Sequence, residues 1–391
     1  MAAAFVVLGL FWGSWAVAIA NVQHTFHLSD GRLGVLLAVA IAVAGVTGAA
    51  LGHRAERWGT GRMLAGSLAA WAVLLVGAGT GRPWPVFAVL FVAAEVAGGC
   101  VDTSMNAAAS RRLHGRPGAL VRFHALFNSG ALGGALATGV ALHLGLSWRW
   151  LWPLLAVIVA AVAVWTWRTQ GVAGDPADGS WGADGPAAGT TDPAGSGGPG
   201  PLQRLRGDGL GLLLVVFALA EITEGGVDTW GVLYLRTHLA AGVLLGAGAY
   251  VVGQSVAAMT RGAGGPLLGR LSPRLALVVG GSLAASGILL ESLSPAVRVA
   301  AVGLALGAGG ASLFWPLVMS QVTRRASRPT AAVGAFTAAG YVGWVAGAPA
   351  VGWVSDTFGP ARGLQLLAAL AAVVVVTSVL RRASGRTVGP D

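Results

Sequence analysis

Long apolar stretches alternate with short polar ones along most of this chain. Each apolar stretch is close to the length of about 20 residues that an α-helix needs to cross a lipid bilayer. The stretches form two series of six, near residues 3–21, 33–52, 63–80, 86–109, 122–144 and 150–167, and near 210–234, 243–262, 275–292, 297–320, 331–353 and 362–380. This pattern predicts an all-α membrane protein with about twelve transmembrane helices.

A polar segment separates the two series. Residues 170–208 are rich in Gly, Pro, Asp, Ala and Ser and offer almost no side chains that could form a core, a composition typical of a disordered linker. We therefore expect a six-helix half at residues 1–169, a disordered cytoplasmic linker at 170–208, and a second six-helix half with a short cytoplasmic tail at 209–391. Parallel repeats of this kind typically have their substrate site near the midplane, between the halves.

Composition independently excludes a soluble protein, because 55% of the residues are hydrophobic, only 10% are charged, and the mean hydropathy is +0.72. The net charge of +10 does not indicate nucleic-acid binding, since the 25 basic residues are all arginines placed mainly in short loops. Most of these loops, including the one to which we assign Arg261, are cytoplasmic if the N-terminus is inside. This positive-inside bias predicts a bacterial inner-membrane protein with both termini in the cytoplasm.

Two acids interrupt the apolar run at 86–109. Glu95 and Asp102 are seven residues apart, and Asn106 follows four residues later, so all three share one helical face. A charged carboxylate at the centre of the bilayer costs about 2.5–3.5 kcal/mol on insertion scales. This face is therefore expected to line an internal cavity rather than to contact lipid.

The first helix of the second series carries a stripe of three acids. Glu221, Glu224 and Asp228 lie three and four residues apart and fall within an arc of about 60° on a helix. Carboxyl groups held in a low-dielectric interior can load and release protons near neutral pH. Asp228 has an alternative interpretation as a solvated acid at the outer interface. We expect Glu291 and Asp356, which fall near helix ends, to be solvated.

The loop after the second expected helix carries Gly52, Glu56, Arg57, Gly59 and Arg62. It resembles the loop between helices 2 and 3 of the major facilitator superfamily, Gly-x-x-x-Asp-Arg-x-Gly-x-x-Arg, with Glu in the place of Asp. The resemblance implies a gating loop whose acid and arginines hold neighbouring helix ends together until the halves rock. The alternative is a solvated loop of the positive-inside kind.

Three further segments narrow the resemblance. GGCVDTSMN (98–106) and FHALFNSGALGG (123–134) resemble the fourth and fifth helices of the fucose permease-like branch, and EGGVDTWGVLYLR (224–236) resembles the seventh helix of uncharacterised transporters near it. The resemblance implies the major facilitator fold, a proton-coupling role for Asp102 and a sugar-contacting amide at Asn128. The coupling acid in the first helix of related sugar symporters has no counterpart here, so Glu224 is expected to supply it.

These considerations give two sets of candidate residues. The proton-coupling candidates are Asp102, Glu224, Glu95, Glu221 and Asp228. The substrate-binding candidates are polar and aromatic side chains on helices expected around the cavity: Asn128, Asn106, His124, Trp15, Asn21, Trp230 and Tyr341. For most of the aromatic residues the alternative is simple packing or a place in the interfacial belt.

The sequence carries no catalytic triad, phosphate-binding loop or nucleotide fingerprint, and no third metal ligand at usable spacing accompanies its histidines. We therefore expect no enzyme activity, no cofactor and no metal. The expected function is proton-coupled uptake of a small polar, sugar-like solute by a monomer in the lipid bilayer. The alternative is proton-antiport efflux of a drug or secondary metabolite. Antiporters of the superfamily typically carry a Gly-Pro motif in helix five, which the segment from Gly130 to Gly134 lacks.

Overall fold

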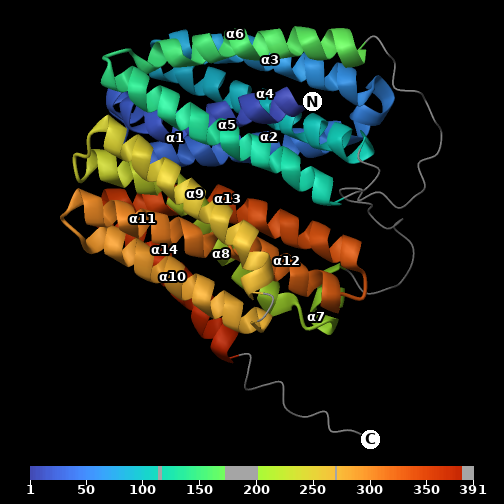
Figure 1. Ribbon diagram of the computed structural model, residues 1–391, viewed down its shortest axis with the longest axis vertical. Coiled ribbons are helices and arrows are strands. Elements are labelled where there is room, and N and C mark those ends of the chain that lie inside the picture. The colour runs from blue at the N-terminus through green and yellow to red at the C-terminus, as the bar shows by residue number, and fades with distance from the viewer. Residues whose placement is uncertain (113–116, 172–200, 269–270, 381–391) are drawn as a thin grey trace, which may run out of the picture. The chain divides into compact units, whose positions relative to one another are not determined.

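The computed structural model describes residues 1–112, 117–171, 201–268 and 271–380, which form helices and short turns with no β-strand among them (Figure 1). Eleven helical segments in these ranges have the length and apolar character needed to cross a membrane. A further helix, α8 (Gly211–Thr237), has a similar length but contains the three acids of the predicted stripe. The prediction of an all-α membrane protein with about twelve spans is confirmed.

The elements follow the order of the predicted apolar stretches. The first series comprises α1 (Ala2–Phe26), α2 (Asp30–Trp58), α3 (Thr60–Thr80), α4 (Trp84–Arg112), α5 (Pro117–His143) and α6 (Trp148–Thr166), followed by a π-helical turn, η1 (Trp167–Gly171), and the short α7 (Pro201–Gly207). After α8 come α9 (Val243–Leu268), α10 (Pro273–Leu293), α11 (Val297–Ala311), α12 (Phe314–Arg325), α13 (Pro329–Phe358) and α14 (Pro360–Leu380). Residues 172–200, most of the predicted linker, and the tail from 381 lie outside the described residues.

The helices group into two compact units. The first unit contains Met1–Ala183 with Arg236–Val251, and the second contains Asp184–Leu235 with Val252–Asp391. The end of α8 from Arg236 and the start of α9 up to Val251 are therefore grouped with the first unit, whereas the rest of both helices, which includes the acids of α8, belongs to the second.

Glycines bring α1 and α5 of the first unit into backbone contact. A Cβ atom added at Gly13 would lie 1.8 Å from the carbonyl oxygen of Ala131, and one added at Gly134 would lie 2.1 Å from that of Leu10. No other residue type fits at such distances, and small residues are what allow membrane helices to approach closely. The glycines of the FHALFNSGALGG motif thus have a packing role. Aromatic rings fill the space beside α1, where the rings of Trp15 and Phe91 pack in a tilted arrangement at a centroid distance of 4.6 Å.

The second unit uses the same device between α10 and α11. A Cβ atom at Gly287 would lie 2.4 Å from the backbone nitrogen of Gly307, and one at Gly310 would lie 2.5 Å from the carbonyl oxygen of Gly280. An apolar core that includes Phe217, Phe314 and Phe336 joins α8, α12 and α13.

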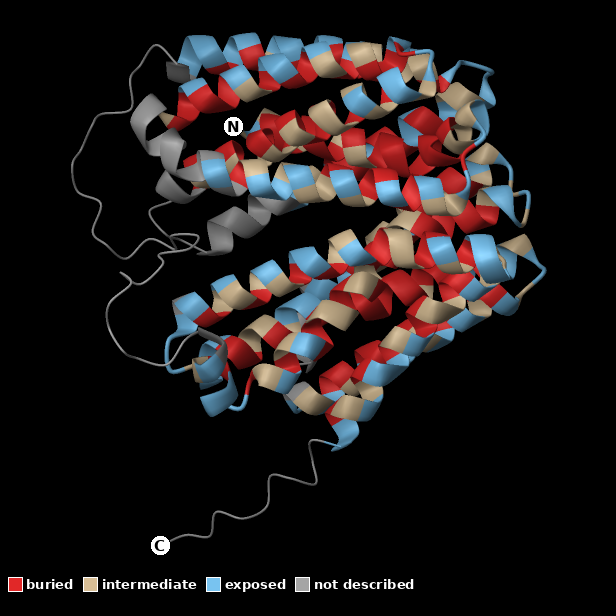
Figure 2. Ribbon diagram, turned by 180° about the vertical axis from the view of Figure 1, so that it is seen from behind, coloured by how far each residue is buried: buried red, intermediate tan, exposed pale blue. Residues whose placement is uncertain are grey.

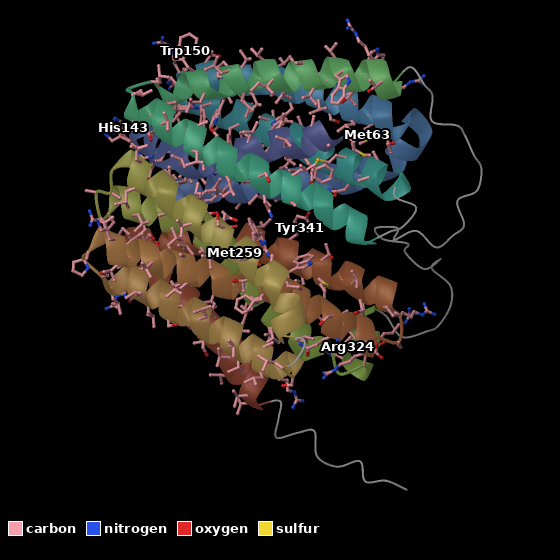
Figure 3. All side chains as sticks on the ribbon, in the orientation of Figure 1. Met63, His143, Trp150, Met259, Arg324 and Tyr341 are labelled. Atoms are coloured by element: carbon pink, nitrogen blue, oxygen red, sulfur yellow. The ribbon has the colours of Figure 1, made fainter. Side chains whose placement is uncertain are left out.

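The outward faces of the helices are apolar. Large side chains such as Val46, Val73 and Val157 are exposed, and Figure 2 shows exposed residues along the outer sides of helices whose inner sides are buried. Such surfaces suit contact with lipid tails. Trp150, near the start of α6, is also exposed (Figure 3), a position typical of the aromatic belt at a membrane interface.

Candidate functional site

Glu221 is the most deeply buried acid of the α8 stripe, with 2% of its surface exposed. Its Oε2 atom accepts a hydrogen bond of 3.3 Å from the indole Nε1 of Trp344 on α13. Its Oε1 atom is buried and has no hydrogen-bond partner among the described residues. The close approach of α13 depends on glycine, because a Cβ atom at Gly343 would lie 2.5 Å from the carbonyl oxygen of Ala218.

Glu224 forms an ion pair with Arg261 of α9 through its Oε1 atom. The side chain of Glu224 is 12% exposed and that of Arg261 is 41% exposed. The other carboxyl oxygen, Oε2, is buried and has no partner in the part of the chain that the structure describes. The assignment of Arg261 to a cytoplasmic loop was wrong, since the residue lies within α9 and its long side chain reaches an acid in the interior of α8.

A break between α11 and α12 helps to hold Arg261. The Nε atom of Arg261 donates a hydrogen bond of 3.1 Å to the carbonyl oxygen of Ser312, at the end of α11. In a continuous helix this carbonyl would accept from the residue four positions later. That residue is Pro316, which has no N–H to donate. The carbonyl is therefore left for the guanidinium group.

Asp228 accepts a hydrogen bond of 2.9 Å from the side-chain amide of Gln254 on α9. Its side chain is half-buried, and this hydrogen bond connects it to the neighbouring helix. Gln254 and Arg261 are seven residues apart and therefore share one face of α9. The antiparallel helices α8 and α9 thus pair Asp228 with Gln254 and Glu224 with Arg261.

Charge balance determines what the α8 acids can do. Among the described residues of this cluster, three carboxyl groups accompany a single cation, Arg261. Uncompensated negative charge is costly in a low-dielectric interior. Protonation of part of the cluster removes that cost, so the arrangement is suited to binding and releasing protons.

On α4 of the first unit, Asp102 and Asn106 form a smaller cluster, and Glu95 lies seven residues before Asp102. The amide of Asn106 donates hydrogen bonds of 3.0 Å to both the Oδ1 atom and the backbone carbonyl of Asp102. Glu95 is buried, with 7% exposed, and no described side chain or backbone group forms a hydrogen bond with its Oε1 atom. The structure therefore brings Asp102 and Asn106 together, one helical turn apart.

The substrate-binding candidates occupy varied environments. Trp15 is packed among aromatic rings, and Trp230 is 3% exposed, with its indole Nε1 buried and without a partner within the described ranges. Tyr341 on α13 is largely exposed (Figure 3), and Asn128 on α5 is half-buried. Asn21 accepts a hydrogen bond of 2.8 Å from Arg236, and both residues are grouped with the first unit. The side chain of His124 lies outside the described residues.

Comparison with known proteins identifies the family. The model of the Major Facilitator Superfamily matches residues 1–348. The chain belongs to this superfamily. Membrane protein MosC of Rhizobium meliloti is 24% identical over 387 residues, which cover 98% of this chain and 90% of that protein. An uncharacterised MFS-type transporter of Yersinia pestis is 28% identical over 369 residues, which cover 90% and 87% of the two chains.

Solved structures agree with this membership at the level of the fold. The nucleoside transporter NupG superimposes with a TM-score of 0.78 at 12% identity, covering 97% of this chain and 96% of that one. A bacterial homologue of the human lysosomal transporter Spinster gives a TM-score of 0.74 at 16% identity, covering 99% and 96%. The family and these structural neighbours are membrane transporters rather than enzymes.

The residues of the predicted gating loop of this superfamily member lie at the end of α2, at Gly59 and in the first turn of α3. Gly59 lies between the two helices with φ of 81°, a left-handed conformation that glycine adopts without strain. Arg62 follows in the first turn of α3 and is exposed. Gly52, Glu56 and Arg57 lie in a stretch of α2 whose side chains are outside the described residues.

Two acids near helix ends behave differently from each other. Asp356 is exposed, as expected. The expectation that Glu291 is solvated was wrong, because its side chain is fully buried on α10. Among the described residues, no group of three His, Cys, Asp or Glu side chains is arranged to hold a metal ion.

Sequence reasoning thus missed Arg261, Gln254 and Glu291 as parts of the interior. A signal existed for the first two, since they lie seven residues apart on a helix next to one with an acidic stripe. Pro316 was a further signal. It lies four residues after Ser312 and has no N–H, so it indicated that the carbonyl of Ser312 would lack its helical donor.

Proposed function

We propose that this transporter moves a small polar, sugar-like solute across the bacterial inner membrane by proton-coupled alternating access. In this proposal the halves at residues 1–169 and 209–391 rock against each other, and residues 170–208 link them on the cytoplasmic side. The resemblance of the 98–106 and 123–134 segments to the fucose permease-like branch supports a sugar-like solute.

The observation that carries the proposal is the ion pair between Glu224 and Arg261, flanked by Glu221 and Asp228. A proton that binds to Glu224 neutralises the carboxylate and removes most of its attraction for the guanidinium group. Arg261 remains held by the carbonyl of Ser312 but gains free N–H donors. These donors are suited to bind hydroxyl groups of a solute.

The coupling of proton and solute movement follows from the competition between the ionised Glu224 and the solute for Arg261. Arg261 cannot make its full contact with the ionised Glu224 and with a solute at once, so a proton and a solute each favour binding of the other. Such a coupling free energy is necessarily reciprocal. Loss of the solute returns Arg261 to Glu224 and expels the proton.

The α4 cluster supplies the corresponding groups of the first half. Asp102 is held by Asn106 and is proposed as its proton-coupling acid. Asn128 is proposed to contact the solute, since an amide both donates to and accepts from hydroxyl groups. Asn106 is then poised to exchange its bond to Asp102 for one to the solute when the acid is protonated.

The experiment uses purified protein in liposomes that contain a pH-sensitive dye, with a panel of sugars and polyols added outside. We expect at least one transported solute to change the internal pH in step with its own movement. The sign of the change separates symport from proton antiport. Transport of a solute from the panel with no proton movement would contradict the proposal.

A further inference from the structure

Five arginines gather at one end of the second unit, within residues 201–210 and 321–330. They are Arg204, Arg206, Arg324, Arg325 and Arg328, and we call them the arginine surface. The same two segments contain one acid, Asp208, so five positive charges and one negative charge give a net charge of +4. Arg204 is half-buried and the other four arginines are exposed. Positive charge concentrated in this way on a surface attracts an anionic partner.

Two hydrogen bonds join the segments that carry these arginines. The Oδ2 atom of Asp208, which follows α7, accepts a bond of 3.0 Å from the backbone N–H of Ser327 and one of 2.9 Å from its hydroxyl group. Ser327 lies between α12 and α13. Leu205 of α7 is buried in the same apolar core as Val322 of α12, and Figure 1 shows α7 beside this end of α12 and α13. The arginines of both segments are therefore held on one surface.

This attachment goes beyond what topology requires. A loop of the positive-inside kind needs only exposed positive charges, and nothing in that rule brings one loop against another. Here a bond between residues 119 positions apart gathers the charges of two loops, in spite of their mutual repulsion. The arrangement is typical of a binding surface for an anion.

The arginine surface also borders the apolar surface of the bundle. One potential membrane span ends at Arg325, and the next begins at Ala331. At the start of α8, shortly after Asp208, Leu212 and Val215 are 52% and 57% exposed. Exposed aliphatic side chains on a membrane-spanning helix suit contact with lipid tails. Charged and apolar side chains thus meet where lipid headgroups meet lipid tails. Figure 3 labels Arg324 at this end of the second unit.

We propose that the arginine surface binds the headgroup of an anionic phospholipid, whose tails lie along the exposed start of α8. Guanidinium groups donate paired hydrogen bonds to phosphate oxygens. Clusters of about four to eight basic residues beside a membrane span are typical of anionic lipid recognition. A zwitterionic lipid gains less from this surface, because its headgroup adds a cation to the phosphate. The inference does not depend on the proposed solute or on proton coupling.

The test uses the full chain in an uncharged detergent and native mass spectrometry, which resolves the protein with no, one or several bound lipids. Titration with phosphatidylglycerol gives the dissociation constant of the first lipid, and phosphatidylcholine with the same tails is the comparison. We expect the wild type to bind phosphatidylglycerol more tightly. In the triple variant Arg206→Gln, Arg324→Gln, Arg325→Gln this binding should weaken on the order of a hundredfold, since each arginine near an anionic headgroup contributes about fivefold.

The matched control removes three exposed arginines elsewhere, through Arg82→Gln, Arg298→Gln and Arg362→Gln. This protein loses the same charge and should bind phosphatidylglycerol as the wild type does. Equal dissociation constants in the triple variant and this control would overturn the inference. Equal affinity of the wild type for the two lipids would also overturn it. Displacement of phosphatidylglycerol by an equal concentration of inorganic phosphate would do so too, because the surface would then be an anion site that makes no use of lipid tails.

A second variant tests the charge in the opposite direction. Asp208→Asn keeps an oxygen that accepts hydrogen bonds from Ser327 but removes the negative charge beside the arginines. We expect its binding of phosphatidylglycerol to tighten by about fivefold, the contribution of one unit of charge. An Asp208→Asn protein that binds phosphatidylglycerol no more tightly than the wild type would contradict a headgroup site at this surface.

Discussion

Arg261 of α9 and Glu224 of α8 form an ion pair inside a membrane-spanning bundle. The arginine is also held by the carbonyl of Ser312, which Pro316 leaves without its usual helical donor. A transporter that holds a cation between a fixed carbonyl and a titratable carboxyl can release that cation by protonation. This relationship is the physical basis of the proposed coupling.

Removing the cation should destabilise the second unit. Arg261→Gln leaves Glu224 buried and unpaired. Breaking a fully buried pair in this way costs about 3–5 kcal/mol, and the cost is smaller here because Arg261 is 41% exposed. We expect a lower melting temperature in detergent. The double variant Arg261→Gln with Glu224→Gln should recover most of the loss, and failure to recover would show that Arg261 stabilises the fold through contacts other than Glu224.

Packing between α1 and α5 gives a second prediction. Gly134→Ala places a Cβ atom 2.1 Å from the carbonyl oxygen of Leu10, so the two backbones must separate. Overpacking of this kind costs about 1–3 kcal/mol, and a unit of this size loses roughly 2–4 °C per kcal/mol. The control is Gly133→Ala, whose Cβ atom would lie 3.7 Å from Leu10. Equal melting temperatures for the two variants would argue against the packing role.

The fold could be predicted because the length of each apolar stretch is set by the bilayer. The acidic stripe of α8 followed from helical periodicity alone. The position of Arg261 did not follow, because an arginine near a helix end can extend either into the cytoplasm or toward an acid on another helix. Counting charges in loops cannot distinguish these two directions.

Glu291 was misjudged for a different reason. Two residues from a helix end, an acid is ordinarily solvated. Here Gly231 and Gly303 let α8 and α11 approach closely enough to cover it. This burial depends on glycines 60 residues earlier and 12 residues later in the chain, and no local pattern around Glu291 indicates it.

Asp102 provides a prediction for the first half. Asp102→Asn retains hydrogen-bonding capacity toward Asn106 but cannot titrate. We expect the variant to lose proton-driven accumulation of solute and to keep solute counterflow in the same liposomes. A variant that still concentrates solute would assign Asp102 a structural role.

The topology leads to a further prediction. The arginine distribution predicts that residues 170–208 are cytoplasmic. A reporter inserted between Ser180 and Gly200 should therefore show cytoplasmic activity, with an insertion after Ser294, between α10 and α11, as the matched outer position. A periplasmic signal from the first insertion would contradict the arrangement of the two halves.

The most direct test of the account measures the protons moved per solute molecule by the Glu224→Gln protein. The measurement follows dye fluorescence and labelled solute together in liposomes, with Asp356→Asn, an exposed acid at a helix end, as the control. The account predicts that Glu224→Gln still exchanges solute but no longer moves protons with it, while the control behaves as the wild type. A Glu224→Gln protein that moves as many protons per solute as the wild type would contradict the central role of this acid.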